Sequence, residues 1–430
     1  MLLIKNGLVT DPGQNLCRKM DILVENGKIK QIEDKITINT KCDVIDAEEC
    51  IAAPGLVDVH VHFRDPGFTY KEDIETGARA AARGGYTSVI LMANTKPVAD
   101  NEDTVTYVIE KGKQTDINVY TCAAVTKGMS GKELTDMDAL LACGAVGFTD
   151  DGIPITDEIL LEKAFQKTAG RKVPISLHEE NPAFIKNNGI NKGKASAYFE
   201  IGGSPREAEI SLITRDLEIA LRTGAILNIQ HISTKEGVEL VRKAKQKAKQ
   251  NASQNGNNNI HAEATPHHFS LTEEAAIQYG TLEKMNPPLR EESDRLAIIE
   301  GLRDGTIDII ATDHAPHSKE EKEKPVTEAP SGISGLETAL SLGVTKLVEE
   351  QGFTHMQLLR CMSTNPAKLY GLNAGTLAVG APADIVIYHP DMEWTAGGYR
   401  SKASNSPFTG QRLRGVVQYT IVKGKVIYKA

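Results

Sequence analysis

Histidine and aspartate residues in this chain recur with the spacing of metal ligands. His60 and His62 are separated by one residue at the end of a β-type run, and side chains two apart on a strand project to the same face. Both imidazoles can therefore reach one ion. Imidazoles mixed with carboxylates suit Zn²⁺, with Mn²⁺, Co²⁺ or Fe²⁺ as lesser options. Further candidate ligands follow other β-type runs: Asp150, Asp151, His178, His231 and Asp313.

The elements that would position these residues form a repeating pattern. Short β-branched runs alternate with helical patterns through the middle of the chain, which is typical of parallel βα units. Eight such units predict an α/β fold, a closed (β/α)8 barrel of the TIM type. The helical patterns include 72–83, 157–169, 205–222, 335–350 and 355–370, and the eight runs are 56–61, 87–92, 117–124, 145–149, 173–177, 225–230, 260–264 and 308–311.

The candidate ligands fall at the ends of five of these predicted strands. In a barrel of this type the strand C-termini converge on one mouth, where active sites lie, so we expect the ligands to meet there. A lone His-x-His pair is a weak signal, and a single buried histidine is often only structural. Their joint occurrence at strand ends predicts a metal site, in which one carboxylate could bridge two ions about 3.5–4 Å apart. Purely structural zinc sites are usually closed and cysteine-rich, which disfavours that alternative.

Both ends of the chain are β-rich. Asn26-Gly27 and Lys423-Gly424 each lie between two apolar stretches and predict two-residue hairpin turns. We therefore expect a small β-sandwich assembled from both termini, with residues 1–54 plus 373–430 in that domain and 55–372 in the barrel. Residues 391–414 are predicted to be irregular, and the polar stretch 245–259 to be a solvated helix end and loop.

Composition excludes several classes of protein. A net charge of −8 over 430 residues argues against a general binder of nucleic acid or anionic membranes, which needs a basic face. It also means that an anionic substrate would require local cations. No apolar run approaches the ~20 residues of a membrane span. Together with six scattered cysteines and no C-x-x-C pair, this predicts a soluble, cytoplasmic protein of a reducing compartment.

The order His60-x-His62, His178, His231 and Asp313 resembles that of the amidohydrolase superfamily. The flanking sequence narrows the resemblance. Segments 54–67 (PGLVDVHVHFRDPG) and 311–317 (ATDHAPH) are similar to the signatures of class I dihydroorotases. The similarity continues through 92–95 (MANT), 148–152 (FTDDG) and 286–290 (NPPLR), and from Gly375 onward.

This resemblance implies the reversible ring closure of N-carbamoyl-L-aspartate to L-dihydroorotate in pyrimidine synthesis, with one or two Zn²⁺ ions. By position, the metal ligands match His60, His62, His178 and His231. Asp151 matches the bridging carboxylate, although the adjacent Asp150 stays an alternative. Asp313 matches the catalytic acid/base that also contacts the metal. The positions that match substrate contacts are Arg64, Asn94, Asn286, His317, Ser331 and Gly332.

Arg64 has a chemical reason to contact substrate, because a guanidinium can grip a carboxylate through two parallel N–H bonds. The long charged loop 315–334 is expected to touch substrate at its two ends. His267 and His268 follow the seventh predicted strand, and we expect them to support the site rather than ligate metal.

Two alternatives stay open. Hydantoinase- and dihydropyrimidinase-like enzymes bridge their metals with a carboxylated lysine on strand four, where this chain reads GFTDD over 147–151. Other family members have lost their metal ligands and act as non-catalytic partners of aspartate transcarbamoylase. The resemblance also allows a homodimer and an association with aspartate transcarbamoylase.

Overall fold

The computed structural model of the chain describes residues 1–252 and 259–430, and within them two eight-stranded β-sheets are present. One sheet is the predicted barrel, whose parallel strands neighbour one another in sequence order. Its first and last strands meet through a bridge between Val61 and His314, and the His62 N–H donates to the His314 carbonyl at 2.9 Å. All eight predicted runs are confirmed as the strands β6 (Leu56–Val61), β7 (Tyr86–Leu91), β8 (Asn118–Ala123), β9 (Gly147–Phe148), β10 (Pro174–Leu177), β11 (Ile226–Ile229), β12 (Ile260–Ala264) and β13 (Ile309–Ile310).

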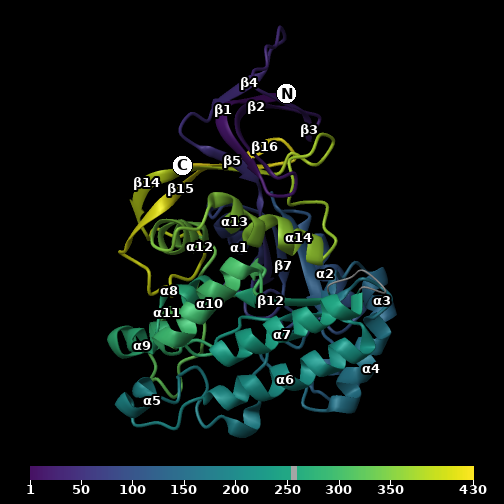
Figure 1. Cartoon of the computed structure of the whole chain (residues 1–430), viewed down its shortest axis with the longest axis vertical. Coiled ribbons are helices and arrows are strands. Elements are labelled where there is room, and N and C mark those ends of the chain that lie inside the picture. Colours follow the sequence, from purple (N-terminus) through teal and green to yellow (C-terminus); the bar gives the residue numbers. More distant parts are fainter. Residues whose placement is uncertain (253–258) are drawn as a thin grey trace.

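Helices follow each barrel strand and surround the sheet (Figure 1). The crossover helices are α1 (Ile74–Arg83), α2 (Glu102–Gly112), α3 (Met137–Ala142), α4 (Glu158–Thr168), α6 (Arg206–Thr223), α7 (Lys235–Ala252) and α10 (Glu292–Asp304). After β13 come α12 (Ala339–Leu342), α13 (His355–Leu359) and α14 (Asn365–Leu369), with π-helical segments at Gly343–Glu349 and Arg360–Thr364. Shorter helices lie in the connections: α5 (Lys194–Tyr198), α8 (Pro266–Ser270), α9 (Glu273–Tyr279) and α11 (Lys319–Lys322).

Four of the five predicted helices begin later than the sequence pattern indicated: at Ile74 and not 72, Glu158 and not 157, Arg206 and not 205, and Ala339 and not 335. Two of these shifts have a clear cause. The pattern places Asp73 inside α1, but its carboxylate caps the helix by accepting the Thr76 N–H at 2.8 Å. Asp157 caps α4 in the same way through the Leu160 N–H. An N-cap side chain satisfies an otherwise unpaired helix donor, so an aspartate at the boundary starts a helix without being part of it. The predicted helix end in the stretch 245–259 is confirmed, since α7 runs to Ala252, whereas residues 253–258 lie outside the described residues.

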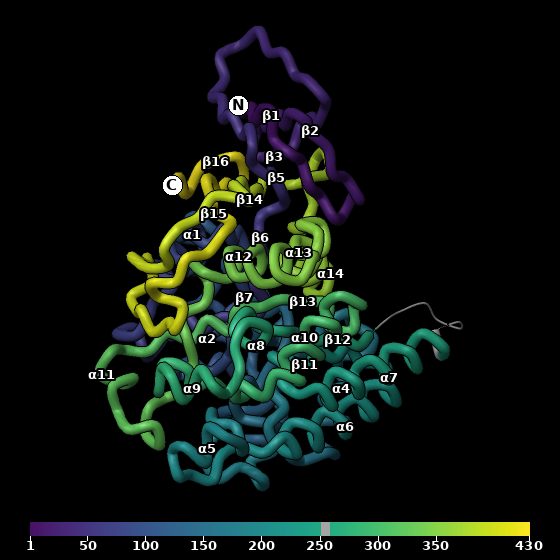
Figure 2. Tube along the Cα trace, turned by 60° about the vertical axis from the view of Figure 1, so that its left-hand side comes forward, coloured from purple at the N-terminus to yellow at the C-terminus, as the bar shows by residue number. Residues whose placement is uncertain are grey.

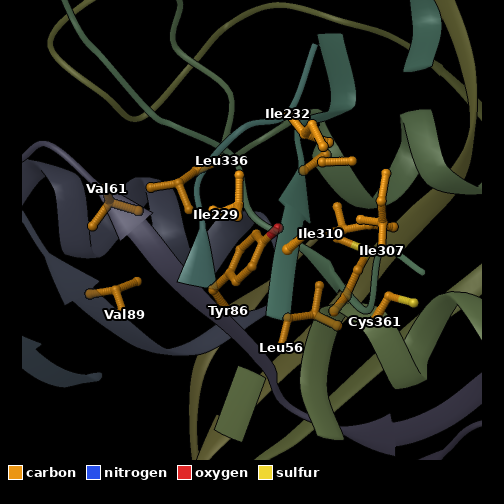
Figure 3. Packing of buried hydrophobic residues seen from close by; sticks show 14 of the residues in the cluster. Leu56, Val61, Tyr86, Val89, Ile229, Ile232, Ile307, Ile310, Leu336 and Cys361 are labelled. Atoms are coloured by element: carbon orange, nitrogen blue, oxygen red, sulfur yellow. The ribbon is translucent and has the colours of Figure 1, made fainter. Parts of the chain in front are cut away.

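Apolar residues of the barrel strands and of the helices around them form a large buried cluster. Figure 3 shows Leu56, Tyr86, Ile229 and Ile310 close together, and each is at most 1% exposed. These side chains come from β6, β7, β11 and β13, so the core joins strands from different parts of the barrel. Close packing of this kind fixes the strands relative to one another, and with them the residues at the strand ends.

The second sheet combines the two ends of the chain, as predicted, and lies at one end of the molecule (Figures 1 and 2). Its strand order is β16-β15-β14-β5-β1-β2-β3, with β4 on β1. Apolar residues of both termini share a buried core, among them Ile4, Ile22, Ile385 and Ile421. The strands are β1 (Leu2–Asp11), β2 (Leu16–Glu25), β3 (Lys28–Glu33), β4 (Asp43–Asp46), β5 (Ile51–Pro54), β14 (Ile385–Thr395), β15 (Arg412–Val422) and β16 (Lys425–Lys429).

The two predicted hairpin turns are confirmed. Asn26 and Gly27 have φ values of 51° and 76°, and Lys423 and Gly424 have 48° and 77°. Positive φ at both central residues is what a type I′ turn requires. The turns approach each other through Ala383, whose N–H donates to the Gly27 carbonyl at 2.9 Å and whose carbonyl accepts the Gly424 N–H at 3.0 Å. The sheet thus bends over its own core.

The prediction that residues 391–414 are irregular is wrong at both ends. β14 continues to Thr395 and β15 begins at Arg412, with Trp394 opposite Leu413. Glu393 forms ion pairs with Arg412 and Arg414 on the facing strand. Opposite charges on facing strands stabilise pairing, which a polar composition alone does not reveal.

Candidate active site

The predicted site residues meet at one cavity of about 190 Å³. His60 lies on β6, and most of the others come within a few residues of the ends of β6, β7, β9, β10, β11 and β13. Asn286, His317, Ser331 and Gly332 belong to later loops. His60 is the one predicted residue outside the lining, and its Nε2 lies 3.4 Å from Asp151 Oδ1. The other predicted residues all line the cavity: His62, Arg64, Asn94, Asp151, His178, His231, Asn286, Asp313, His317, Ser331 and Gly332.

His60 and His62 face two carboxylates. Nε2 of His60 lies 3.5 Å from Asp313 Oδ1, and Nε2 of His62 lies 3.0 Å from the same oxygen. His62 Nε2 is also 3.4 Å from Asp151 Oδ2. The alternation of side chains along β6 places both rings on the interior face, as the His-x-His spacing predicted.

His178 and His231 complete the group from the opposite side. His178 Nδ1 and His231 Nε2 lie 3.8 and 3.6 Å from Asp151 Oδ1, and 3.0 Å from each other. Asp151 therefore contacts all four histidines, which is the central position that a bridging carboxylate needs. Three sets of donor atoms, each within 4.8 Å of one another, could each hold an ion: His60, His62 and Asp151; His60, His231 and Asp313; Asp151, His178 and His231.

The protonation pattern of the histidines fits metal binding. His60 Nδ1 lies 3.1 Å from the Glu263 carboxylate, which can only accept, so Nδ1 carries a proton and Nε2 is the ring atom available to a metal. In the described part of the chain this buried Nε2 has no hydrogen-bond partner. His62 Nδ1 lies 2.9 Å from Asn94 Oδ1, and its Nε2 lies 3.0 Å from Asp313 Oδ1, so both ring nitrogens are engaged. A buried ring nitrogen without a partner is costly unless a cation binds to it.

Both central aspartates are held in the ionised form. Burial acts to raise the pKa of Asp151, but the neighbouring imidazoles of His60, His231 and His62 outweigh it and hold this pKa well below its usual value. The same opposition, with His60 and His62 as the main partners, lowers the pKa of Asp313. Carboxylates bind divalent cations in the ionised form. Burial acts to lower the pKa of His60, but the same aspartates outweigh it and raise this pKa, so a bound cation would displace a proton from that ring.

Asp151 rather than Asp150 lies among the histidines. Oδ1 of Asp150 accepts the Val125 and Thr126 N–H groups at 2.8 and 3.1 Å, and Oδ2 accepts the Thr126 hydroxyl. These bonds tie the end of β9 to the loop after β8. Asp150 thus fixes the local backbone, and the neighbouring Asp151 is turned into the cavity.

The backbone is left-handed at three site residues. Arg64, His231 and Asp313 have φ values of 58°, 28° and 46°. Non-glycine residues in such conformations cost roughly 1–3 kcal/mol each and persist where the surrounding structure fixes them, often at functional sites. Here the conformation turns each side chain toward the cavity immediately after its strand ends.

Arg64 carries the positive charge of the cavity lining. Among the described residues that line the cavity, Arg64 is the one lysine or arginine side chain. Its Nε donates to the Pro316 carbonyl at 3.3 Å. The Arg64 guanidinium lies 3.4 Å from His317 Nε2, which donates to the Ser331 carbonyl at 2.9 Å. Burial and the nearby charges of Arg64 and Lys71 lower the pKa of His317 to about 2, so it is neutral. Arg64 is therefore the group that can pair with a substrate carboxylate.

Comparisons with known proteins agree with this geometry. Residues 51–427 match the amidohydrolase family. Dihydroorotases of Clostridioides difficile strain 630 and Clostridium acetobutylicum are 53% and 50% identical to the chain, with full coverage of both partners in each case. The chain belongs to the dihydroorotase family of amidohydrolases. The structure of an L-hydantoinase from Arthrobacter aurescens superposes with a TM-score of 0.87 at 26% identity, covering 100% of this chain and 96% of that one.

Two acidic residues that support the dihydroorotase-family site were missed by the sequence interpretation. Glu263, on β12, is fully buried against His60. Glu180 lies 3.3 Å from His178 Nε2, on the side of the ring away from Asp151. A signal for Glu263 existed, because a carboxylate inside the apolar run 260–264 needs a buried partner.

His267 and His268 are absent from the three donor groups, which cover the described residues. His268 lies within hydrogen-bond distance of Thr265 Oγ1 at 2.7 Å and of the Pro287 carbonyl at 3.0 Å. It thereby holds the loop that carries Asn286. His267 stacks on His268 with ring centroids 4.6 Å apart.

Proposed function

We propose that this member of the dihydroorotase family catalyses the reversible cyclisation of N-carbamoyl-L-aspartate to L-dihydroorotate and water in pyrimidine biosynthesis. One observation carries the proposal: the candidate metal donors and one half-buried guanidinium, that of Arg64, meet at a cavity of about 190 Å³. That volume suits a small ring, and the arrangement suits a molecule with one reacting and one spectator carboxyl group.

The metal is proposed to be Zn²⁺, one or two ions per chain, held by the four histidines with Asp151 between them and Asp313 alongside. Mixed imidazole and carboxylate donors suit this ion. When bound, it acts as a Lewis acid that polarises a carbonyl oxygen and lowers the pKa of water.

Asp313 is proposed as the proton carrier. Ring closure forms a bond between the ureido nitrogen and a carboxylate carbon, breaks one carbon–oxygen bond and releases water. The departing oxygen must therefore gain two protons, one from the nitrogen and one from the solvent. Asp313 Oδ1 is ionised and lies at the cavity, where it can accept the proton from the nitrogen and return it to the leaving oxygen. In the reverse direction it takes a proton from the attacking water and delivers it to the nitrogen.

The remaining lining residues are proposed to orient the substrate. Arg64 pairs with the spectator carboxylate. His317, which lies 3.4 Å from the Arg64 guanidinium, and Asn94 line the same cavity and can contact the substrate. Asn286 Oδ1 is buried and has no hydrogen-bond partner among the described residues, so it can accept an N–H of the ureido group. Ser331 and Gly332 form the wall beside Asn286.

The two alternatives are less well supported. A hydantoinase-like bridge needs a lysine at the end of β9, and Asp151 stands in the cavity instead. A non-catalytic partner would lack ligands, whereas all of the predicted ligands converge here. Further proposals are the domain division into 1–54 plus 373–430 and 55–372, a homodimer, an association with aspartate transcarbamoylase, and a cytoplasmic location suggested by six free cysteines. Within the described residues no helix is both long enough and apolar enough to cross a membrane.

The test is hydrolysis of L-dihydroorotate by the purified chain, followed by ultraviolet absorbance, with metal content measured on the same sample. Hydantoin and dihydrouracil are assayed beside it. Activity on dihydroorotate that a chelator removes and Zn²⁺ restores supports the proposal. Metal-loaded protein that opens hydantoin or dihydrouracil but not dihydroorotate refutes it.

A further inference from the structure

Two lysines are buried beside the wall of the cavity, in segments that the catalytic scheme does not use. Lys284 and Lys322 are each 4% exposed. Within the described residues neither lysine forms an ion pair within 4.0 Å. Burial, together with the charge of Lys284, lowers the pKa of Lys322, and the buried Glu283 is the acid that acts most strongly to raise it. Buried lysines without close partners are rare and costly. Their retention calls for hydrogen bonds that offset the loss of hydration.

Those hydrogen bonds all go to one short stretch of backbone. Each of the four consecutive carbonyl groups of residues 329–332 accepts a hydrogen bond from a buried side chain. The Ala329 carbonyl accepts from Lys284 Nζ at 2.7 Å, and the Pro330 carbonyl accepts from Lys322 Nζ at 3.0 Å. The Ser331 carbonyl accepts from His317 Nε2 at 2.9 Å. The Gly332 carbonyl accepts from Lys322 Nζ at 3.0 Å and from Asn405 Nδ2 at 3.1 Å. The Gly332 N–H in turn donates to the Lys284 carbonyl at 2.8 Å.

This stretch forms part of the substrate cavity. Ser331 and Gly332 line it, and His317, which bonds the Ser331 carbonyl, lies against Arg64. Gly332 has a φ of 128°, and a Cβ at that position would lie 2.6 Å from the Ala315 Cβ. The wall is thus tightly fitted, although residues 329–332 belong to no helix or strand.

Irregular backbone of this kind usually moves unless its polar groups are bonded. Lys322 reaches the wall from α11, which lies near α9 at the edge of the barrel (Figure 2). Lys284 reaches it from the segment just before Asn286. The two lysines therefore connect the wall to two separate parts of the fold.

We propose that Lys322 and Lys284 are positioning residues that fix the 329–332 wall of the cavity and thereby set substrate affinity. They act on binding, through backbone carbonyls, and not on the metal donors. The effect on substrate rests on the proposed function, whereas the effect on the wall does not.

The principal variant is Lys322→Met, which keeps the apolar stem and removes two hydrogen bonds. Lys284→Met removes one and serves if the first variant does not fold. We expect Lys322→Met to raise KM for L-dihydroorotate about tenfold or more, since two bonds are lost, with kcat within about threefold of the parent. Lys319→Met is the matched control, because Lys319 lies on the same helix with its side chain 82% exposed.

A second measurement is independent of substrate. Hydrogen–deuterium exchange of the zinc-loaded full chain is expected to be faster at residues 331–334 in Lys322→Met, and unchanged in Lys319→Met. Unchanged KM, whatever the exchange rates, overturns the proposal, and so does a joint loss of kcat and metal content. If the parent chain does not turn over dihydroorotate, the proposed function fails. In that case faster exchange in Lys322→Met still supports the role of Lys322 in fixing the 329–332 wall, and unchanged exchange overturns it.

Discussion

Replacement of Glu263 is expected to weaken metal binding without any change in a metal ligand. The Glu263 carboxylate and the His60 ring are both fully buried, and Oε2 lies 3.1 Å from Nδ1. The other oxygen accepts the Asn228 amide. Because Glu263 accepts the Nδ1 proton, it keeps His60 Nε2 directed at the central carboxylates. It also adds negative charge behind the ligand, which makes the imidazole a better donor.

The expected magnitude follows from this contact. A hydrogen bond to a charged group contributes about 1.5–3 kcal/mol, and about 1.4 kcal/mol corresponds to a factor of ten. Glu263→Gln keeps the shape and an acceptor but loses the charge, so we expect metal affinity to fall about tenfold. Glu263→Leu removes the acceptor as well and leaves the Asn228 amide with Ser176 Oγ as its remaining acceptor. We expect that variant to lose about 100-fold in affinity and about 1–3 kcal/mol of stability.

The assay is competition for Zn²⁺ with a chromophoric chelator, which gives a Kd without reference to catalysis. Glu239→Gln is the control, since Glu239 lies on α7 with its side chain 47% exposed and paired with Arg242. Circular dichroism establishes that each variant is folded. A folded Glu263→Gln protein with the parent Kd would refute the reasoning, because the charge behind His60 would then contribute nothing to the metal site.

Three further outcomes are expected. Asp313→Asn should retain bound metal, measured by elemental analysis, and lose about 10²–10⁴ in kcat; activity within tenfold of the parent contradicts its role. Arg64→Lys should raise KM for dihydroorotate at least about tenfold because lysine lacks the planar fork, and an unchanged KM excludes the proposed carboxylate contact. Asp308 tests pH dependence. Burial acts to raise its pKa, but His261 and Lys245 outweigh it and lower the pKa from 3.8 to about 2. The stabilisation, about 2 kcal/mol from that shift, is present above pH 4 and lost as pH falls through about 2. Chemical unfolding at pH 7 and pH 2 should show this loss in the parent and not in Asp308→Asn, and equal pH dependence in both contradicts it.

The barrel could be predicted because its signals are local. Each strand is a short apolar run bounded by polar residues, and each is followed by a helical period, so the order of elements is written along the chain. The errors occur where a boundary depends on one side chain. Asp73 and Asp157 belong to the helical pattern but cap their helices instead. Glu393 and its arginine partners extend a hairpin through a segment whose composition indicates a loop.

The metal donors could be predicted because barrel geometry carries strand ends to one mouth whatever the loops do. The choice between Asp150 and Asp151 as the residue among the histidines could not be predicted. β9 has only two residues, and which of the next two side chains turns inward depends on hydrogen bonds from Val125 and Thr126. Glu263 lies 203 positions from His60, and no sequence spacing relates them. Lys322 binds backbone carbonyls, which every residue has, so residue type gives no sign of its partners.

The site divides into two parts with different physical supports. Metal donors stand on or directly after strands, where core packing and buried carboxylates such as Glu263 hold them. The substrate wall is irregular backbone held by buried side-chain donors. This division explains how a protein of net charge −8 can bind a dianion. In the proposed site, positive charge comes from the bound cation and from Arg64, while burial lowers the pKa of His317 and keeps that ring neutral. In the proposed scheme the carboxylate at the metal donors reacts and the one paired with Arg64 does not, because the two groups of residues differ in chemistry and not only in position.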